Sequence, residues 1–362
     1  MRPKEKVSVG MEKKSHTSRL QPSEFLWRLY KPEEAKYRFK ANTSNEAKKW
    51  QESTARDLSM TVGFQDVPLL DVKPEIVEEV DKGDYIRKKI LIHTTEYSTM
   101  PVYLLLPKMQ EKPLKTVLAF NGHGYGVKDI IGLWEDGTER SIADGYQKDF
   151  AVSLCRKGMA VVAPEIFCFG ERVTDFSYIN KIIGQQEPGT CGHSSFLAFY
   201  FGKSVLGFRI FEMKILIDYL QRLPELDPNR IGAMGISGGG MLAFFLTALE
   251  QRIRACAISG YFCTFEHSIF AMNHCICNVV PGLHQFGEMY DIAGLIAPRP
   301  MLIEAGSRDP IFPIGAVQAS VKKVKNIYEV FKCNQNLQTD YFEGRHQISG
   351  QKAFDFLKAN LT

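Results

Sequence analysis

One serine set among glycines limits this chain to folds in which a strand turns sharply into a helix. Residues 231–236 are apolar and suit a buried strand, and residues 241–249 suit a helix. Between them, residues 235–239 read Gly-Ile-Ser-Gly-Gly, which matches Gly-x-Ser-x-Gly. We expect any side chain at position 235 or 239 to collide with the adjoining strand or helix. A glycine-rich corner whose serine only caps the helix would look the same, so the rest of the chain must decide.

Length and charge exclude several classes of protein. The 362 residues allow two domains or one large α/β domain with insertions. A net charge of +4, from 45 basic and 41 acidic residues, is too small to indicate a nucleic-acid partner. The longest uncharged stretch, residues 231–249, contains five glycines, so we expect no membrane span.

The cysteines indicate a reducing compartment and give only a weak metal signal. Eight of them are scattered along the chain, and residues 1–20 lack the apolar core of a secretion signal, so we expect a cytoplasmic protein with free thiols. Cys275 and Cys277 beside His274 could form a metal-binding corner, but no second pair at zinc-type spacing accompanies them. The sequence therefore predicts neither a metal nor a cofactor.

The chain divides into three parts. Residues 1–20 are basic and are expected to form a mobile tail, and residues 21–84 a helical extension packed on the core. In this extension, Thr43 and Glu46 form a capping box before a helix. Residues 85–362 are expected to form the catalytic domain, with long insertions near 167–205 and 260–296 that are typical of lids or binding loops.

Strands and helices alternate through the third part. Two hairpin-like strands followed by strand–helix alternation predict an α/β fold: an eight-stranded, mostly parallel sheet with helices on both faces. The expected strands are 86–93, 102–106, 116–121, 160–164, 231–236, 255–259, 300–305 and 339–342. The expected helices are 142–157, 207–222, 239–249, 316–328 and 350–359. Ligands of such sheets bind at the carboxyl ends of the strands.

Two further residues at strand ends could activate Ser237. Asp309 follows an apolar strand, and His346 follows the last strand just before the final helix. Taken alone, Asp309 could simply start a turn, and His346 could be an ordinary surface histidine. Glu304 is a competing acid, but it lies within its strand. The order Ser237, Asp309, His346 nevertheless predicts a nucleophile, an orienting acid and a general base.

A glycine-rich loop after the third strand is expected to complete an oxyanion hole. Two backbone amides must face the developing negative charge, and Gly238, next to the serine, supplies one. We expect the amide of Tyr125 to supply the other, with that of Gly124 as the alternative. His123 is expected to buttress this loop rather than to act as the base. The loop lacks the spacing of a phosphate-binding loop.

These residues resemble the α/β-hydrolase superfamily over residues 85–360. More narrowly, the chain is similar to bacterial esterases of the acetyl xylan esterase and cephalosporin-C deacetylase type and to dienelactone-hydrolase-like proteins. Besides the serine motif, the matching stretches are residues 123–126, 169–172, 223–232 and 298–300. The resemblance implies cofactor-free ester hydrolysis through an acyl-serine, often on acetyl groups. Gly238 departs from the glutamine that often follows the serine in such deacetylases.

The expected function is hydrolysis of carboxylic esters with short acyl groups. The same three residues would also serve a peptidase or amidase, or a lactonase or carbon–carbon-bond hydrolase. An inactive relative that only binds its ligand is an alternative of another class. The expected partner is a small-molecule ester, with neither nucleic acid nor membrane, and a homo-oligomer is possible.

Overall fold

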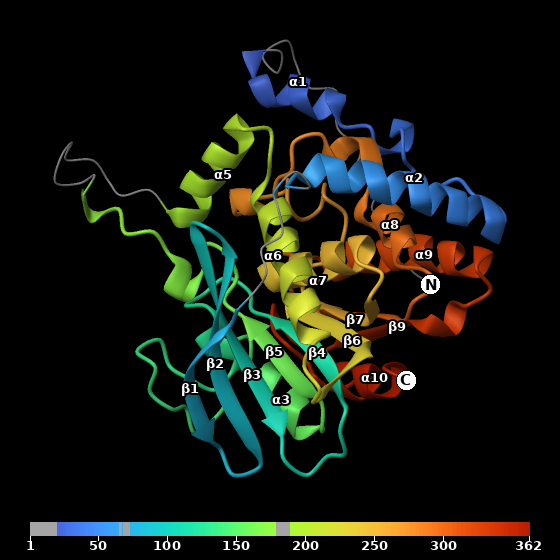
Figure 1. Cartoon of the computed structure of the whole chain (residues 1–362). Coiled ribbons are helices and arrows are strands. Elements are labelled where there is room, and N and C mark those ends of the chain that lie inside the picture. Colours follow the sequence, from blue (N-terminus) through green and yellow to red (C-terminus); the bar gives the residue numbers. More distant parts are fainter. Residues whose placement is uncertain (1–19, 65–66, 68–72, 179–188) are drawn as a thin grey trace, which may run out of the picture.

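Nine strands form one sheet through the middle of the molecule (Figure 1). The computed structural model describes residues 20–64, 67, 73–178 and 189–362. The strands are β1 (Glu75–Asp81), β2 (Tyr85–Thr95), β3 (Ser98–Pro107), β4 (Leu114–Phe120), β5 (Ala160–Pro164), β6 (Leu226–Ile236), β7 (Ile253–Ser259), β8 (Met301–Gly306) and β9 (Leu337–Phe342). Their order is β1-β2-β3-β5-β4-β6-β7-β8-β9. Neighbours are antiparallel from β1 to β5 and parallel from β5 to β9.

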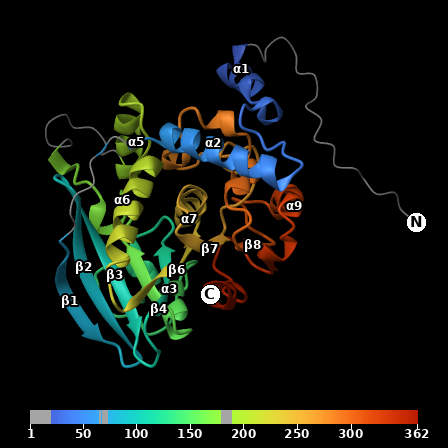
Figure 2. The same cartoon turned by 45° about the vertical axis from the view of Figure 1, so that its right-hand side comes forward.

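Helices cover both faces of this sheet and bury two separate apolar clusters (Figures 1 and 2). The main helices are α1 (Pro22–Leu29), α2 (Ser44–Val62), α3 (Phe150–Arg156), α5 (Thr190–Tyr200), α6 (Val205–Leu220), α7 (Gly238–Leu249), α8 (Met289–Ile292), α9 (Ile314–Val330) and α10 (Ala353–Asn360). α3 and α10 pack on one face, whereas α6, α7 and α9 pack on the other. The central strands β4 to β8 are mostly buried and apolar because both of their faces are covered.

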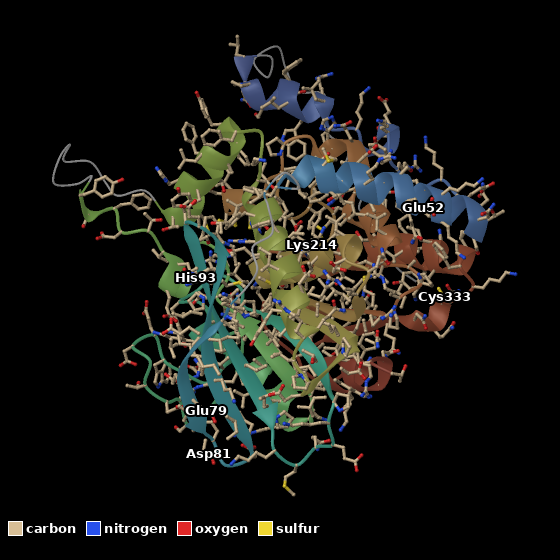
Figure 3. All side chains as sticks on the ribbon, in the orientation of Figure 1. Glu52, Glu79, Asp81, His93, Lys214 and Cys333 are labelled. Carbon is tan, nitrogen blue, oxygen red and sulfur yellow. The ribbon has the colours of Figure 1, made fainter. Side chains whose placement is uncertain are left out.

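The expected count of eight strands was wrong because β1 was missed. β1 lies within residues 21–84, where the sequence predicted only helices, and its side chains are almost all exposed. It reads Glu-Ile-Val-Glu-Glu-Val-Asp, which lacks the apolar–polar alternation of a half-buried strand. Glu79 pairs across to Lys88 of β2 at 3.0 Å, and Asp81 follows at the outer edge of the sheet (Figure 3). Cross-strand charge pairing, which one segment alone cannot reveal, thus contributes to its register.

The expected helix over residues 142–157 is shorter than predicted. α3 begins only at Phe150, since Lys148 and Asp149 have φ values of 51° and 48°. A helix cannot pass through two left-handed residues, so residues 142–149 form turns instead. This irregular segment carries Gln147 and Tyr146 to the carboxyl edge of the sheet.

Of the two amino-terminal α-helices, α2 packs on the body of the protein, whereas α1 buries no residue. The predicted capping box is present: the Glu46 amide donates to Thr43 Oγ1, and the Thr43 amide donates to Glu46 Oε2. α2 buries Leu58 and Val62 in the cluster shared with α6 and α7. The tail expected over residues 1–20 lies, apart from Leu20, outside the described residues. In the part of the chain that is described, no helix combines the length and the apolarity needed to cross a bilayer.

Candidate active site

Ser237 occupies a strained corner between β6 and α7. Its φ and ψ are 55° and −121°, and its amide donates to the carbonyl of Ser259 on β7 at 3.0 Å. A Cβ on Gly235 would lie 2.2 Å from the Gly239 carbonyl oxygen, and one on Gly239 would lie 2.0 Å from that of Phe120. The expectation that side chains at 235 and 239 would collide with helix and strand is confirmed. Only glycine at both positions lets α7 approach β4 and β6 this closely.

His346 and Asp309 form a hydrogen-bonded pair at the same edge of the sheet. His346 Nδ1 lies 2.7 Å from Asp309 Oδ2, and the other carboxylate oxygen accepts the amides of Ile311 and Phe312 at 2.8 and 3.1 Å. The imidazole stacks between the rings of Tyr146 and Phe312, with centroids 5.5 and 5.8 Å away. Because the Asp309 side chain is almost fully buried and accepts from Nδ1, it favours the tautomer with a free lone pair on Nε2.

The free nitrogen of His346 lies close to the serine corner. Nε2 is buried and has no hydrogen-bond partner among the described residues, so a bond to the Ser237 hydroxyl is not formed in this structure. A Cβ on Gly260 would lie 3.0 Å from His346 Cε1, and the preceding carbonyl, of Ser259, accepts the Ser237 amide. The imidazole of His346 and the amide of Ser237 therefore both contact the peptide between Ser259 and Gly260. Hydrogen bonds of catalytic groups often tighten only when substrate binds.

Glu304, the competing acid, is committed to other partners. Its carboxylate accepts the hydroxyl of Ser259 at 2.7 Å and the amides of Ser349 and Gly350 at 2.9 Å. Burial raises the pKa of Glu304, and these three donors counteract that rise. The structure thus pairs His346 with Asp309, while Glu304 anchors the loop that follows His346.

The loop after β4 reaches Ser237 through residues that the sequence did not single out as donors. A Cβ on Gly122 would lie 3.1 Å from Ser237 Cβ, and one on Gly238 would lie 3.0 Å from the ring of His123. Gly238 is the first residue of α7, where backbone amides have no partner within the helix. Gly238 and the 122–123 segment therefore lie beside the serine, and Tyr125 follows further along the loop.

Side chains from distant segments hold this loop in place. The Tyr125 hydroxyl donates to the Leu133 carbonyl at 3.1 Å and accepts from Arg140 at 2.7 Å. Gln147 Oε1 accepts the Gly122 amide at 2.6 Å. A Cβ on Gly124 would contact the same Gln147 at 3.6 Å. Sequence analysis missed Gln147 because this residue was expected inside a regular helix.

Glu165, at the end of β5, clamps two loops beside the site. Its carboxylate is fully buried and accepts the amides of Val127 and Glu171 at 3.0 and 3.2 Å. Burial raises the pKa of Glu165 to about 7, although both amide donors oppose the shift. A Cβ on Gly126 would lie 2.5 Å from this carboxylate, so the loop needs a glycine there.

Both long insertions contribute to a pocket of about 500 Å³ next to the loop after β4. Phe169 and Cys191 come from the first insertion, and His274 and Cys275 come from the second. Aromatic residues of the second insertion, such as Phe262, are buried in the core instead. The insertions therefore shape the surface beside the serine corner.

Three residues that line this pocket, His123, Cys191 and Cys275, belong with Cys277 to a group of possible metal ligands. His123, Cys191, Cys275 and Cys277 place their ligand atoms within 4.8 Å of one another. His274, the sequence neighbour considered for such a site, is not in the group; its ring packs against Phe312 at 5.9 Å. The sequence missed this group because His123 and Cys191 come from other loops.

Comparison with known proteins gives a family and a named relative. The model of a family described as "Abhydrolase family" matches residues 5–353. A Bacillus subtilis (strain 168) protein described as "Putative hydrolase YtaP" is 27% identical over 271 residues, which are 72% of this chain and 83% of that protein.

Solved structures show the same fold. A Bacteroides fragilis protein described as a "putative acetyl xylan esterase" has a TM-score of 0.73 at 17% identity, covering 89% of this chain and 82% of that one. A glucuronoyl esterase from Solibacter usitatus has a TM-score of 0.63 at 15% identity, covering 86% of this chain and 92% of that one. At such identities the likeness establishes the α/β-hydrolase fold.

The geometry of the serine corner predicts that two glycine substitutions will differ greatly in their effect on stability. Gly239→Ala places a Cβ against the Phe120 carbonyl, and we expect it to lower the free energy of unfolding by at least about 2 kcal/mol. The matched control is Gly315→Ala in α9, where a Cβ meets nothing within 4 Å, and we expect it to be neutral or stabilising. Urea denaturation measures both. Equal stabilities would contradict the corner geometry.

Glu165 predicts a specific pH dependence of stability. A buried carboxyl whose pKa is raised from 4.5 to about 7 stabilises the fold fully below pH 4.5, and this contribution is lost as pH rises toward 7. The stability of the natural protein relative to Glu165→Gln should therefore fall by on the order of 2–3 kcal/mol between about pH 4.5 and pH 7.5. Urea denaturation across this range checks it, and a constant difference between the two proteins would refute it.

Proposed function

This chain belongs to the Abhydrolase family, and from that premise we propose that it is a serine hydrolase that cleaves carboxylic esters. One observation carries the proposal. The Asp309–His346 pair leaves a buried Nε2, with no hydrogen-bond partner among the described residues, beside a serine held in a strained corner at the end of β6. A base oriented by an acid, next to a hydroxyl at a strand end, is the arrangement that nucleophilic attack on an acyl carbon needs.

In the first half of the reaction, Ser237 becomes acylated. His346 Nε2 takes the hydroxyl proton while the serine oxygen attacks the ester carbonyl carbon. Asp309 holds the imidazole orientation and stabilises the imidazolium that forms. The oxyanion accepts hydrogen bonds from the amide of Gly238 and from an amide of the loop after β4, for which we keep Tyr125, with Gly124 as the alternative. Collapse of the intermediate releases the alcohol, which takes its proton from His346.

In the second half, water replaces the alcohol. His346, neutral again, takes a proton from a water molecule that attacks the acyl-serine carbonyl. The same amides stabilise the second tetrahedral intermediate, and its collapse releases the acid while His346 returns the proton to Ser237 Oγ. The stacked rings of Tyr146 and Phe312 hold the imidazole in one plane through both halves.

We assign short acyl groups, including acetyl, to the substrate. Two structural neighbours are described as acetyl xylan esterases, which supports an acetyl ester whose larger part is a carbohydrate alcohol. The pocket of about 500 Å³ is lined by both insertions and by His123, which lies beside Gly238, so it offers room for such a group near the serine corner. A substrate of this kind is small and polar.

The direct test removes the nucleophile. Ser237→Ala should keep the fold and lower turnover of p-nitrophenyl acetate by about 10⁴-fold or more, because the attacking oxygen is lost. The matched control is Ser320→Ala, which removes a buried serine hydroxyl from α9 and should leave turnover unchanged. A fluorophosphonate probe should label the natural protein and Ser320→Ala but not Ser237→Ala.

Substrate choice separates the remaining alternatives. We expect p-nitrophenyl acetate and acetylated sugars to be hydrolysed faster than octanoyl esters, lactones and p-nitroanilides. Faster hydrolysis of anilides would indicate an amidase or peptidase, and faster opening of lactones a lactonase. Unchanged ester hydrolysis by Ser237→Ala would refute the proposed nucleophile, and a protein that neither reacts with the probe nor hydrolyses any of these substrates would be an inactive binding protein.

A further inference from the structure

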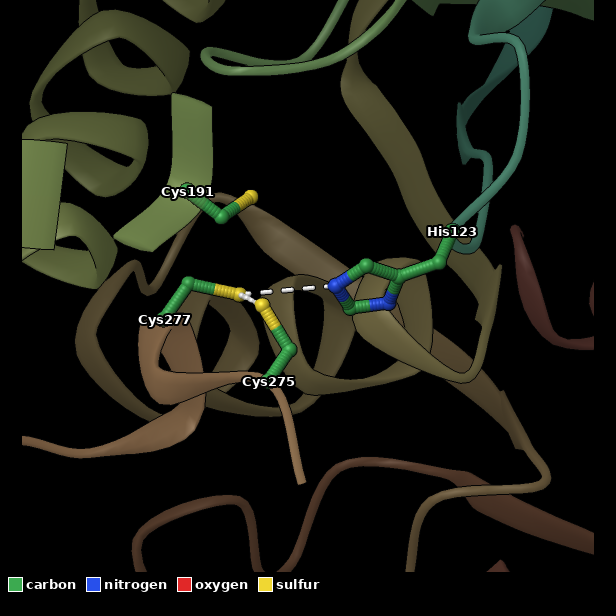
Figure 4. Close-up of side chains that lie close together, drawn as sticks. All are labelled: His123, Cys191, Cys275 and Cys277. Atoms are coloured by element: carbon green, nitrogen blue, oxygen red, sulfur yellow. Dashed lines mark hydrogen bonds between the residues drawn. The ribbon is translucent and has the colours of Figure 1, made fainter. Parts of the chain in front are cut away.

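Four soft ligand atoms from three separate segments converge beside the oxyanion loop (Figure 4). His123 lies on the loop after β4, Cys191 near the start of α5, and Cys275 and Cys277 at the short helix η5 (Ile276–Asn278). Cys277 Sγ lies 3.6 Å from His123 Nε2 and 3.2 Å from Cys275 Sγ. Figure 4 shows the three thiols and the imidazole turned toward one another.

These distances are close to those of a tetrahedral metal site. With Zn–S bonds of about 2.3 Å, two sulfur ligands of one tetrahedral zinc ion lie about 3.8 Å apart. All four ligand atoms fall within 4.8 Å of one another, so small rotations of the side chains bring them around one ion. Three thiolates and one imidazole form a common structural zinc set, and soft sulfur ligands disfavour magnesium and calcium.

We propose that His123 Nε2 and the sulfurs of Cys191, Cys275 and Cys277 bind one Zn²⁺ ion. Binding breaks the three S–H bonds and releases their protons to solvent, and the neutral imidazole donates its Nε2 lone pair. Four protein ligands close the coordination shell, so the ion has a structural role and leaves no position for substrate. The inference goes beyond ester hydrolysis and does not depend on it.

A buried arginine provides an independent argument for negative charge in this cluster. Arg209 on α6 is fully buried, and no carboxylate among the described residues forms an ion pair with it. Its guanidinium donates to the Phe167 carbonyl at 2.9 Å and lies 4.0 Å from Cys191 Sγ. A buried cation is costly unless an anion is near.

The charges balance when zinc is present. Three thiolates without a metal would place three negative charges beside the single positive charge of Arg209. Zn²⁺ reduces the cluster to one negative charge, which Arg209 neutralises. Asn278 Nδ2, 3.8 Å from Cys277 Sγ, adds an N–H donor to a metal-bound sulfur.

The ion would connect the two insertions to the oxyanion loop. Cys191 belongs to the first insertion, Cys275 and Cys277 to the second, and His123 to the loop that contacts Gly238. With Nε2 on the metal, the remaining ring proton must reside on Nδ1. Nδ1 lies 3.0 Å from the position of a Cβ on Gly238, so zinc would fix both the place and the tautomer of the ring beside the proposed oxyanion donor.

The test is the metal content of the intact, tag-free protein purified under reducing conditions. Inductively coupled plasma mass spectrometry should find about one zinc per chain, as a closed four-ligand site requires. Cys191→Ser and Cys277→Ser should each lose most of it, because serine is a poor zinc ligand. The matched control is Cys333→Ser, which changes a buried cysteine far from the cluster and should retain zinc (Figure 3).

A second measurement uses only the natural protein, in case the variants fail to fold. Metal-free, reduced protein should bind about one Co²⁺ per chain with the intense visible absorption of a tetrahedral thiolate site, and Zn²⁺ should displace it. Substoichiometric zinc with no cobalt spectrum, or zinc retained by both ligand variants, would overturn the proposal.

Discussion

The absence of two Cβ atoms determines how this molecule is assembled around its site. Without side chains at Gly235 and Gly239, α7 packs directly against β4 and β6, and Ser237 is forced to a positive φ between them. Parallel pairing brings the carboxyl ends of β4, β6 and β7 to one edge of the sheet, and the loops of the site begin at these ends. The surrounding sheet sustains the local strain at Ser237, and this buried serine lies at the carboxyl edge of the sheet.

The sequence predicted those parts of the site that each depend on one short segment. Ser237, Asp309 and His346 each follow a strand with a clear apolar run, and parallel strands place their carboxyl ends at one edge. What it missed depends on partners distant in the chain. Strand β1 pairs with β2 through charged side chains across the two strands. The position of Gln147 depends on a turn that interrupts an apparent helix. The sequence likewise did not predict that Gly122 and His123 lie beside the serine corner, because backbone direction in a glycine-rich loop cannot be inferred from its residue types.

The cysteine cluster is a second case in which residues distant in the chain form a site that the sequence did not predict. Zinc motifs are recognised in sequence by paired ligands at short spacing, whereas here one pair, Cys275 and Cys277, is completed by His123 and Cys191 from two other loops. His123 therefore has two neighbours of different kinds: thiols at its Nε2 and the first residue of α7 at its Nδ1. With zinc bound, His123 would both anchor the two insertions and position the loop beside the oxyanion site. This would explain how such long insertions keep a defined shape beside the serine.

The central claim is that Ser237, His346 and the Gly238 amide act on one acyl group. A crystal structure of the protein inactivated by a small alkyl fluorophosphonate tests it most directly, because the adduct resembles the tetrahedral intermediate. We predict phosphorus bonded to Ser237 Oγ, a phosphonyl oxygen about 3 Å from the Gly238 amide nitrogen, and His346 Nε2 within hydrogen-bond distance of the adduct. Phosphorus on another residue, or an adduct on Ser237 from which His346 stays remote, would contradict the claim.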